Sequence, residues 1–113
     1  MNIRILAALL WLPAVAGPGW AQKTYSGSEA AALRCANTLA LTAIALSDTG
    51  RMGEAEKDVM LGITVLILER HVTGTWAQKK AALAVVRDRR DTLETLRDFE
   101  RYAETCLAQF PIN

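Results

Sequence analysis

The clearest alternation of apolar and polar positions lies near the C-terminus. Apolar residues recur there at spacings of three and four, namely Leu96, Phe99, Ala103, Cys106 and Phe110. This spacing is typical of one face of an α-helix. Charged residues occupy other faces of the same helix, namely Glu94, Arg97, Asp98, Arg101 and Glu104. The pattern therefore predicts an amphipathic surface helix that ends before Pro111.

Two earlier stretches, residues 39–46 and 59–68, are apolar on almost every side of a helix. Both are far shorter than the roughly 20 residues that cross a bilayer, so we expect no membrane span in the mature chain. Leu61, Val65 and Leu68 form the candidate interaction face, which would meet a second copy or another protein. Alternatively, these three positions face the other helices of the same chain at a wide crossing.

Short signals mark the ends of the first two helices. Residues 26–29 read Ser-Gly-Ser-Glu, which is the form of a capping box, so a helix should begin near Gly27. Residues 48–50 read Asp-Thr-Gly and should end it. A second helix is expected over about 51–72.

The C-terminal part of the chain allows two interpretations. Residues 75–78 form another capping box, which predicts a helix start at Trp76. The span 76–108 could be one long helix or two helices divided within 87–91. Residues 91–94, Asp-Thr-Leu-Glu, would cap the start of a fourth helix.

The N-terminus has the pattern of a secretory signal peptide. Arg4 precedes an apolar run over 5–16, and Gly19 and Ala21 supply small residues at the −3 and −1 positions of a cleavage site. We expect residues 1–21 to be removed, which leaves 22–113 as a single helical domain. The predicted location is therefore periplasmic or secreted.

Export changes the interpretation of the two cysteines. Cys35 and Cys106 both lie in the mature part, and an even count in an oxidising compartment favours a disulfide between them. In the chain-entropy model, a bond that closes so long a loop stabilises the fold by roughly 4 kcal/mol.

The same bond bears on the number of helices. In an up-and-down bundle, the first helix starts at the end where an even-numbered last helix finishes. Bonded cysteines have Cα atoms within about 7 Å, so four helices would satisfy the bond. We therefore predict an all-α fold, a small up-and-down four-helix bundle closed by one disulfide. The alternative is a helical hairpin packed on one long bent C-terminal helix, because the apolar stripe keeps its phase through 87–91.

Charge and chemistry exclude several functions. Lys and Arg number 13 against 12 Asp and Glu, so no cationic excess favours nucleic acid. His71 is the single histidine, no metal or haem motif occurs, and we predict no cofactor. A small periplasmic enzyme, the alternative function, would have to use carboxylates such as Glu29, Glu69 or Asp58 as acid and base.

These observations predict a small exported protein that acts non-catalytically, through binding to another protein or to itself. The role would be binding, chaperone-like or structural, in the cell envelope. In size and architecture the chain is similar to small exported helical proteins with one disulfide, a group that includes acid-stress chaperones. That similarity involves no motif and assigns no residues.

Overall fold

The computed structural model describes residues 23–113, and every regular element in this range is a helix. In chain order the helices are α2 (Gly27–Asp48), α3 (Glu54–His71), α4 (Trp76–Asp88) and α5 (Thr92–Gln109). The predicted signal peptide, residues 1–21, lies outside the described residues. The predicted all-α fold with four helices is confirmed.

Separate caps divide the C-terminal part into α4 and α5. The Asp91 carboxylate accepts a hydrogen bond from the backbone N–H of Glu94 at 2.7 Å, and the Thr95 hydroxyl donates to the Asp91 carbonyl at 3.0 Å. In an uninterrupted helix the Glu94 N–H would instead donate to a backbone carbonyl of the preceding turn, so the bond to the Asp91 side chain marks the start of a new helix. The single long bent helix, which the sequence left open, is therefore not what the chain forms.

The two other predicted capping boxes have different outcomes. At the start of α4 the box is complete, because Gln78 N–H donates to Thr75 Oγ1 at 3.1 Å and Thr75 N–H donates to Gln78 Oε1 at 2.9 Å. At the start of α2 the predicted box is wrong, since the Ser26 side chain caps nothing. The Glu29 carboxylate instead accepts two bonds from Thr73, in the loop after α3. The helix nevertheless begins at Gly27, as predicted.

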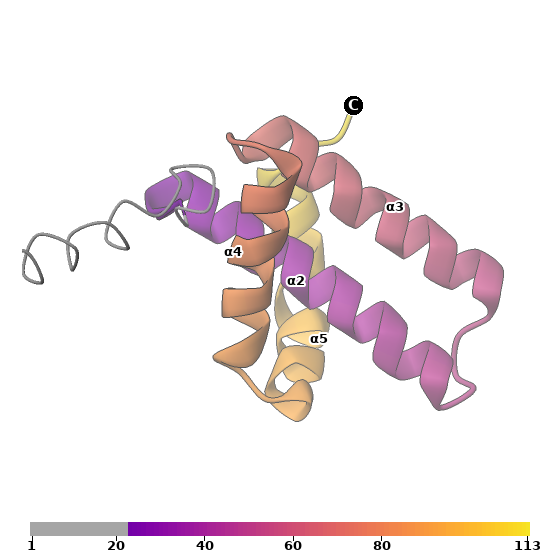
Figure 1. The fold of residues 1–113 in the computed structure, drawn as a ribbon. Coiled ribbons are helices and arrows are strands. Elements are labelled where there is room, and N and C mark those ends of the chain that lie inside the picture. The colour runs from indigo at the N-terminus through magenta and orange to yellow at the C-terminus, as the bar shows by residue number, and fades with distance from the viewer. Residues whose placement is uncertain (1–22) are drawn as a thin grey trace, which may run out of the picture.

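Helix α2 is the centre of the arrangement (Figure 1). It packs extensively against each of the other three helices, whereas no other pair among these four has an extensive contact. Helix α3 returns alongside α2 as a hairpin, and α4 and α5 cross α2 on its two opposite sides. The core consists of buried apolar side chains gathered around α2: Ala32, Leu33, Cys35, Ala36, Leu39, Ile67, Leu68, Val72, Ala82 and Phe110.

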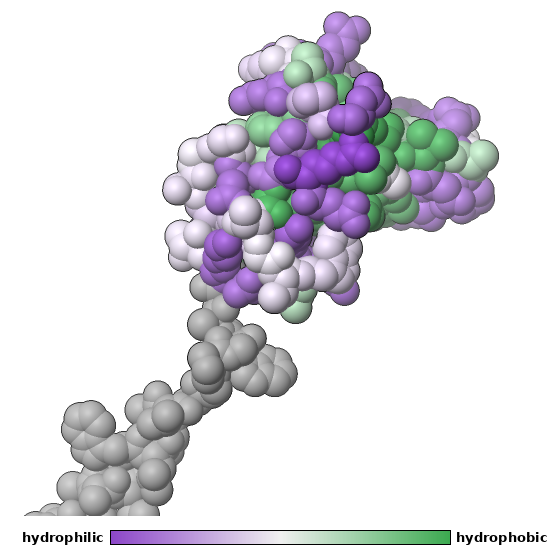
Figure 2. Space-filling view, turned by 90° about the horizontal axis from the view of Figure 1, so that it is seen from above, coloured by the Kyte–Doolittle hydropathy of each residue, from purple (hydrophilic) through white to green (hydrophobic). Residues whose placement is uncertain are grey.

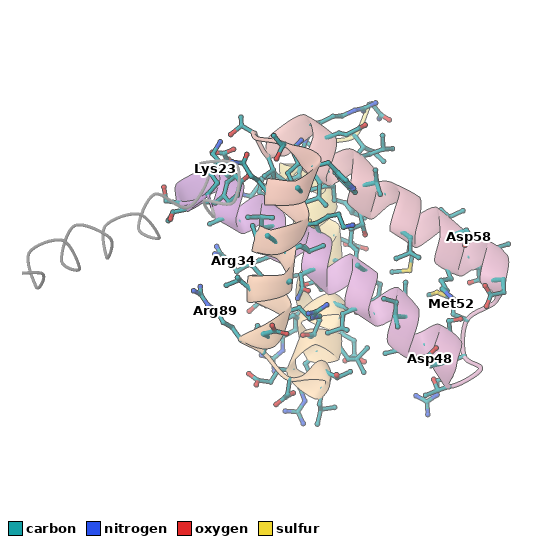
Figure 3. The ribbon with its side chains drawn as sticks, viewed as in Figure 1. Lys23, Arg34, Asp48, Met52, Asp58 and Arg89 are labelled. Atoms are coloured by element: carbon teal, nitrogen blue, oxygen red, sulfur yellow. A yellow bond between two sulfur atoms is a disulfide. The ribbon has the colours of Figure 1, made fainter. Side chains whose placement is uncertain are left out.

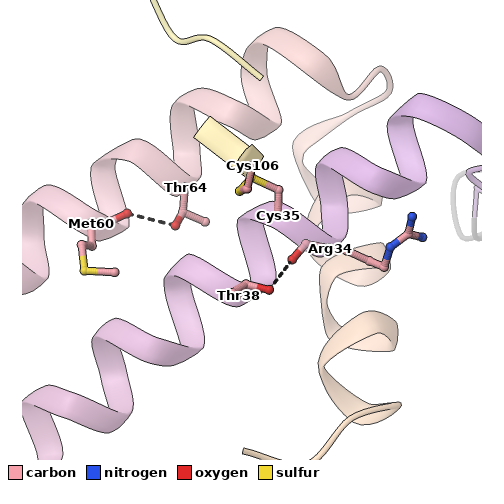
Figure 4. The surroundings of a disulfide bond; sticks show 6 residues. All are labelled: Arg34, Cys35, Thr38, Met60, Thr64 and Cys106. Atoms are coloured by element: carbon pink, nitrogen blue, oxygen red, sulfur yellow. Dashed lines mark hydrogen bonds between the residues drawn. A yellow bond between two sulfur atoms is a disulfide. The ribbon is translucent and has the colours of Figure 1, made fainter. Parts of the chain in front are cut away.

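The disulfide joins the first helix to the last. Cys35 on α2 is bonded to Cys106 on α5, with 5.6 Å between their Cα atoms (Figure 4). Cys35 is buried and Cys106 half-buried. The bond therefore holds α5 to the central helix, which is the one helix that α5 contacts extensively.

The far end of the α2–α3 hairpin extends beyond α4 and α5 (Figure 1). We call this end the α2–α3 arm and define it as residues 39–48 of α2 and 54–66 of α3. Toward the tip of the arm, away from α4 and α5, each helix is covered on one side by the other, and its remaining sides face outward. An apolar sequence in this place must expose apolar side chains, because nothing else in the described part of the chain covers them.

Candidate functional site

The predicted interaction face is only partly exposed. Val65 is 40% exposed and Leu61 is half-buried, but Leu68 is 2% exposed and belongs to the core. The prediction is therefore wrong for Leu68, which faces α2 as the alternative interpretation had it. Leu68 lies beyond the arm, where α3 packs against the crowded middle of the molecule.

A different row of residues on α3 faces outward. Ala55, Val59, Gly62 and Leu66 follow one another at spacings of four, three and four, which places them along one side of the helix. The first three are exposed, Val59 by 62%, and Leu66 is half-buried. We call these four residues the α3 stripe. Seen from above, apolar surface lies between charged residues toward the end of the molecule that α2 and α3 form (Figure 2).

Sequence reasoning missed the α3 stripe for a physical reason. Residues 59–68 are apolar on nearly all sides, so a spacing of three and four fits several faces equally well. One available signal was the position of Asp58 and Glu69. Around the helix axis, both lie between the α3 stripe and the predicted interaction face. Both are exposed, so they indicate the side of α3 that points to solvent.

Charged residues of opposite sign flank the two ends of the α3 stripe. Glu56 follows Ala55 in the first turns of α3, and Arg70 lies four residues after Leu66 in the last turn. Both are exposed, and within residues 23–113 neither takes part in an ion pair. The helix dipole favours a negative group at the start of α3 and a positive group at its end, as here.

A basic groove lies on another part of the surface, between α2 and α4. Its cavity of about 570 Å³ is lined by cations and by apolar side chains, and no carboxylate lines it. The cations are Lys23, Arg34, Arg89 and Arg90. Figure 3 shows Lys23, Arg34 and Arg89 on the side away from the tip of the α2–α3 arm. Such a groove attracts anions.

Two of these four cations already have partners. Arg90 pairs with Asp98 at 2.8 Å and with Glu94 at 3.5 Å, and Lys23 donates to the Thr73 hydroxyl at 2.6 Å. A second cavity of about 360 Å³ beside the disulfide shares Arg34 and Arg90 with the groove. The net attraction that the groove can exert on a ligand is correspondingly reduced.

The carboxylates considered for catalysis do not converge. Asp58 and Glu69 are eleven residues apart on α3, about 16 Å along the axis. Glu29 lies at the start of α2, where Thr73 donates to it through its N–H and its hydroxyl, both at 2.7 Å. These bonds hold the pKa of Glu29 below its usual range. None of the three lines either cavity, and Glu29 ties the start of α2 to the loop after α3.

His71 has a structural setting as well. Its Nε2 lies 2.7 Å from the Pro111 carbonyl oxygen, which can only accept, so Nε2 carries the proton. The ring also meets Phe110 edge-on, with 5.4 Å between centroids. His71 therefore fastens the C-terminal tail to the end of α3. Within residues 23–113, no three His, Cys, Asp or Glu side chains are grouped to hold a metal ion.

By length and composition, α2 is the one helix within the described range that could cross a membrane. The core helix of a soluble protein passes the same test, and α2 packs against three other helices. No protein-family model, no curated protein and no solved structure matches this chain.

Proposed function

We propose that the protein is exported and acts without catalysis, by binding another protein chain through the apolar surface of the α2–α3 arm in the cell envelope. The observation that carries the proposal is the exposed α3 stripe, in which Val59 is 62% exposed on a helix that is covered on one side. The chaperone-like or structural role that the sequence indicates is a form of such binding.

Energetics support an interface there. Fully burying a valine or leucine side chain contributes about 1.5–3 kcal/mol. Val59 is largely exposed, Leu66 is half-buried, and Ile44 on the neighbouring helix is 43% exposed. Val59 and Leu66 lie along one side of α3, whereas Ile44 is exposed on the other helix of the arm. A partner that covers Val59 and Leu66 gains a few kcal/mol of apolar burial, which offsets part of the entropy lost on association.

Site-specific photo-cross-linking in cells that export the full chain tests the proposal. A photoreactive residue replaces Val59 in one variant and Ala81, an exposed alanine of α4, in a matched control. We expect a protein adduct from position 59 and none from position 81. No adduct at position 59, or equal adducts at both positions, would contradict binding through the α2–α3 arm.

A further inference from the structure

We propose that the basic groove between α2 and α4 binds an amphiphilic anion, a small molecule with one acidic headgroup on a single apolar chain. This site is separate from the α2–α3 arm and does not depend on the proposed function. Three properties of the groove support it: two arginines without an anionic partner, an apolar floor, and a wall that is already held in place.

Arg34 and Arg89 are the cations of the basic groove that have no partner. Arg34 belongs to α2 and Arg89 follows the last residue of α4, and both are exposed. Both line the same cavity, and Figure 3 shows them extending to the same side of the molecule. Neither takes part in an ion pair within residues 23–113, and the neighbouring Asp88 pairs with Arg87 at 3.2 Å. Like charges that line one cavity repel each other, so an anion between them is stabilised by both.

The guanidinium group also selects the kind of anion. Its planar set of N–H donors matches the two oxygens of a carboxylate or a phosphate, to which it can donate two parallel hydrogen bonds. The groove supplies two such groups, and no carboxylate of residues 23–113 lines it. A carboxylate or phosphate headgroup therefore fits the polar side of the groove.

The floor of the groove is apolar. Leu33 of α2 and Ala82 of α4 belong to the core and are only 2% and 7% exposed, yet both line the cavity. The cavity thus extends inward from the exposed arginines to the core. Val85 is half-buried and also lines it. An inorganic anion would leave this apolar surface in water, whereas an apolar chain on the same molecule would cover it.

The remaining wall, residues 23–25, is fastened to the loop after α3. The Tyr25 hydroxyl donates to the Thr73 carbonyl and Lys23 Nζ donates to the Thr73 hydroxyl, both at 2.6 Å. The groove is therefore formed before a ligand binds, which lowers the entropic cost of binding. Its cavity of about 570 Å³ lies within the range of about 300–1,000 Å³ that is usual for small-molecule sites. A single chain can enter such a cavity, whereas a flat bilayer surface would touch only its exposed rim.

Isothermal titration calorimetry with decanoate tests the site. The oxidised protein, isolated from cells that express the full chain, should bind decanoate at concentrations below those at which micelles form. Decyl maltoside has a neutral headgroup on the same chain, and inorganic phosphate is an anion without a chain. Each should bind about tenfold more weakly than decanoate, or less, because each lacks one of the two sets of contacts.

Three variants locate the binding site. Arg34→Gln and Arg89→Gln each remove one guanidinium and should raise the dissociation constant for decanoate by about tenfold or more. Val85→Glu places a carboxylate four residues before Arg89, a spacing at which helical side chains form ion pairs. This internal carboxylate should take the place of the headgroup and abolish decanoate binding.

Arg97→Gln is the matched control. Arg97 is an exposed arginine of α5 that lines neither cavity and forms no ion pair within the described range. Its replacement should leave decanoate binding unchanged. Circular dichroism checks that each variant keeps its helices, and the variants of the two exposed arginines suffice for the test if Val85→Glu unfolds.

Several results would overturn this inference: no binding of decanoate, equally tight binding of decyl maltoside or phosphate, no effect of either arginine variant, or an equal loss in Arg97→Gln. Binding to vesicles of phosphatidylglycerol and phosphatidylcholine without binding of free decanoate would also overturn it, because a membrane surface would then be the partner. Cross-linking at position 59 is independent of all these results, so the proposed function stands or falls separately.

Discussion

Reduction of the bond between Cys35 and Cys106 should be the largest single perturbation of this fold. The bond closes a sequence separation of 71 residues. In the chain-entropy model, a loop of that length stabilises the folded state by about 4 kcal/mol at 25 °C. For a domain of this size, such a loss lowers the melting temperature by roughly 15–30 °C.

The structure also indicates which helix loses most stability when the disulfide is reduced. Helix α5 contacts α2 extensively and no other helix to a comparable degree, so the disulfide lies within its main packing contact. After reduction, we expect the backbone amides of α5 to exchange with solvent faster than those of the α2–α3 hairpin. Hydrogen exchange followed by mass spectrometry would measure this difference.

Urea unfolding of the oxidised and reduced protein, followed by far-UV circular dichroism, gives the free-energy change. The variant Cys35→Ala/Cys106→Ala is the control, because reductant should not affect it. A loss of less than about 1 kcal/mol on reduction would contradict the reasoning, since it would mean that the loop is already restricted in the unfolded chain.

Three other changes have defined outcomes. Thr42→Val should raise the free energy of unfolding, measured by urea denaturation, by about 1 kcal/mol. The reason is that the Thr42 hydroxyl is buried without a hydrogen-bond partner among the described residues. The control Thr64→Val removes a hydroxyl that is hydrogen-bonded, so it should bring no such gain. Glu29→Gln should destabilise the protein at neutral pH. The bonds from Thr73 lower the pKa of Glu29, so its contribution is fully present above the unfolded-state pKa and is lost as pH falls below that value through the lower folded-state pKa. A gap in unfolding free energy between parent and variant that stays constant as pH falls through these two pKa values would refute the assignment. Intact mass spectrometry of the exported product should show a chain that begins at Gln22, whereas a full-length cytoplasmic chain would contradict export.

Local signals predicted the helices well. The bonds between Thr75 and Gln78 involve residues three apart, so their geometry depends only on the adjacent backbone. At the start of α2 the same type of signal misled, because Thr73, 44 residues away, offered Glu29 two donors. A local sequence pattern cannot indicate a distant hydrogen-bond donor, such as Thr73, that the tertiary fold brings next to the same side chain.

The interaction surface was harder to predict for a related reason. Which side of α3 faces outward depends on how α3 packs against α2, and the α2 residues that cover it are not encoded within α3 itself. Leu68 and Val65 are equally apolar in sequence terms, yet one is 2% exposed and the other 40%. The disulfide was predictable because both its cysteines were known and no other pairing existed.

The central position of α2 has a consequence for the order of folding. Helices α2 and α3 are joined by a short turn, so their contacts are local and close quickly, whereas α5 must reach α2 from the far end of the chain. In the export that we propose, with the N-terminus first, the hairpin would cross the membrane before Cys106, so that Cys35 would still have no partner. We expect a transient state with a formed hairpin and two free thiols, which thiol alkylation during refolding under oxidising conditions would trap. The slowest step in reaching the native protein would then be the return of the last helix to the first.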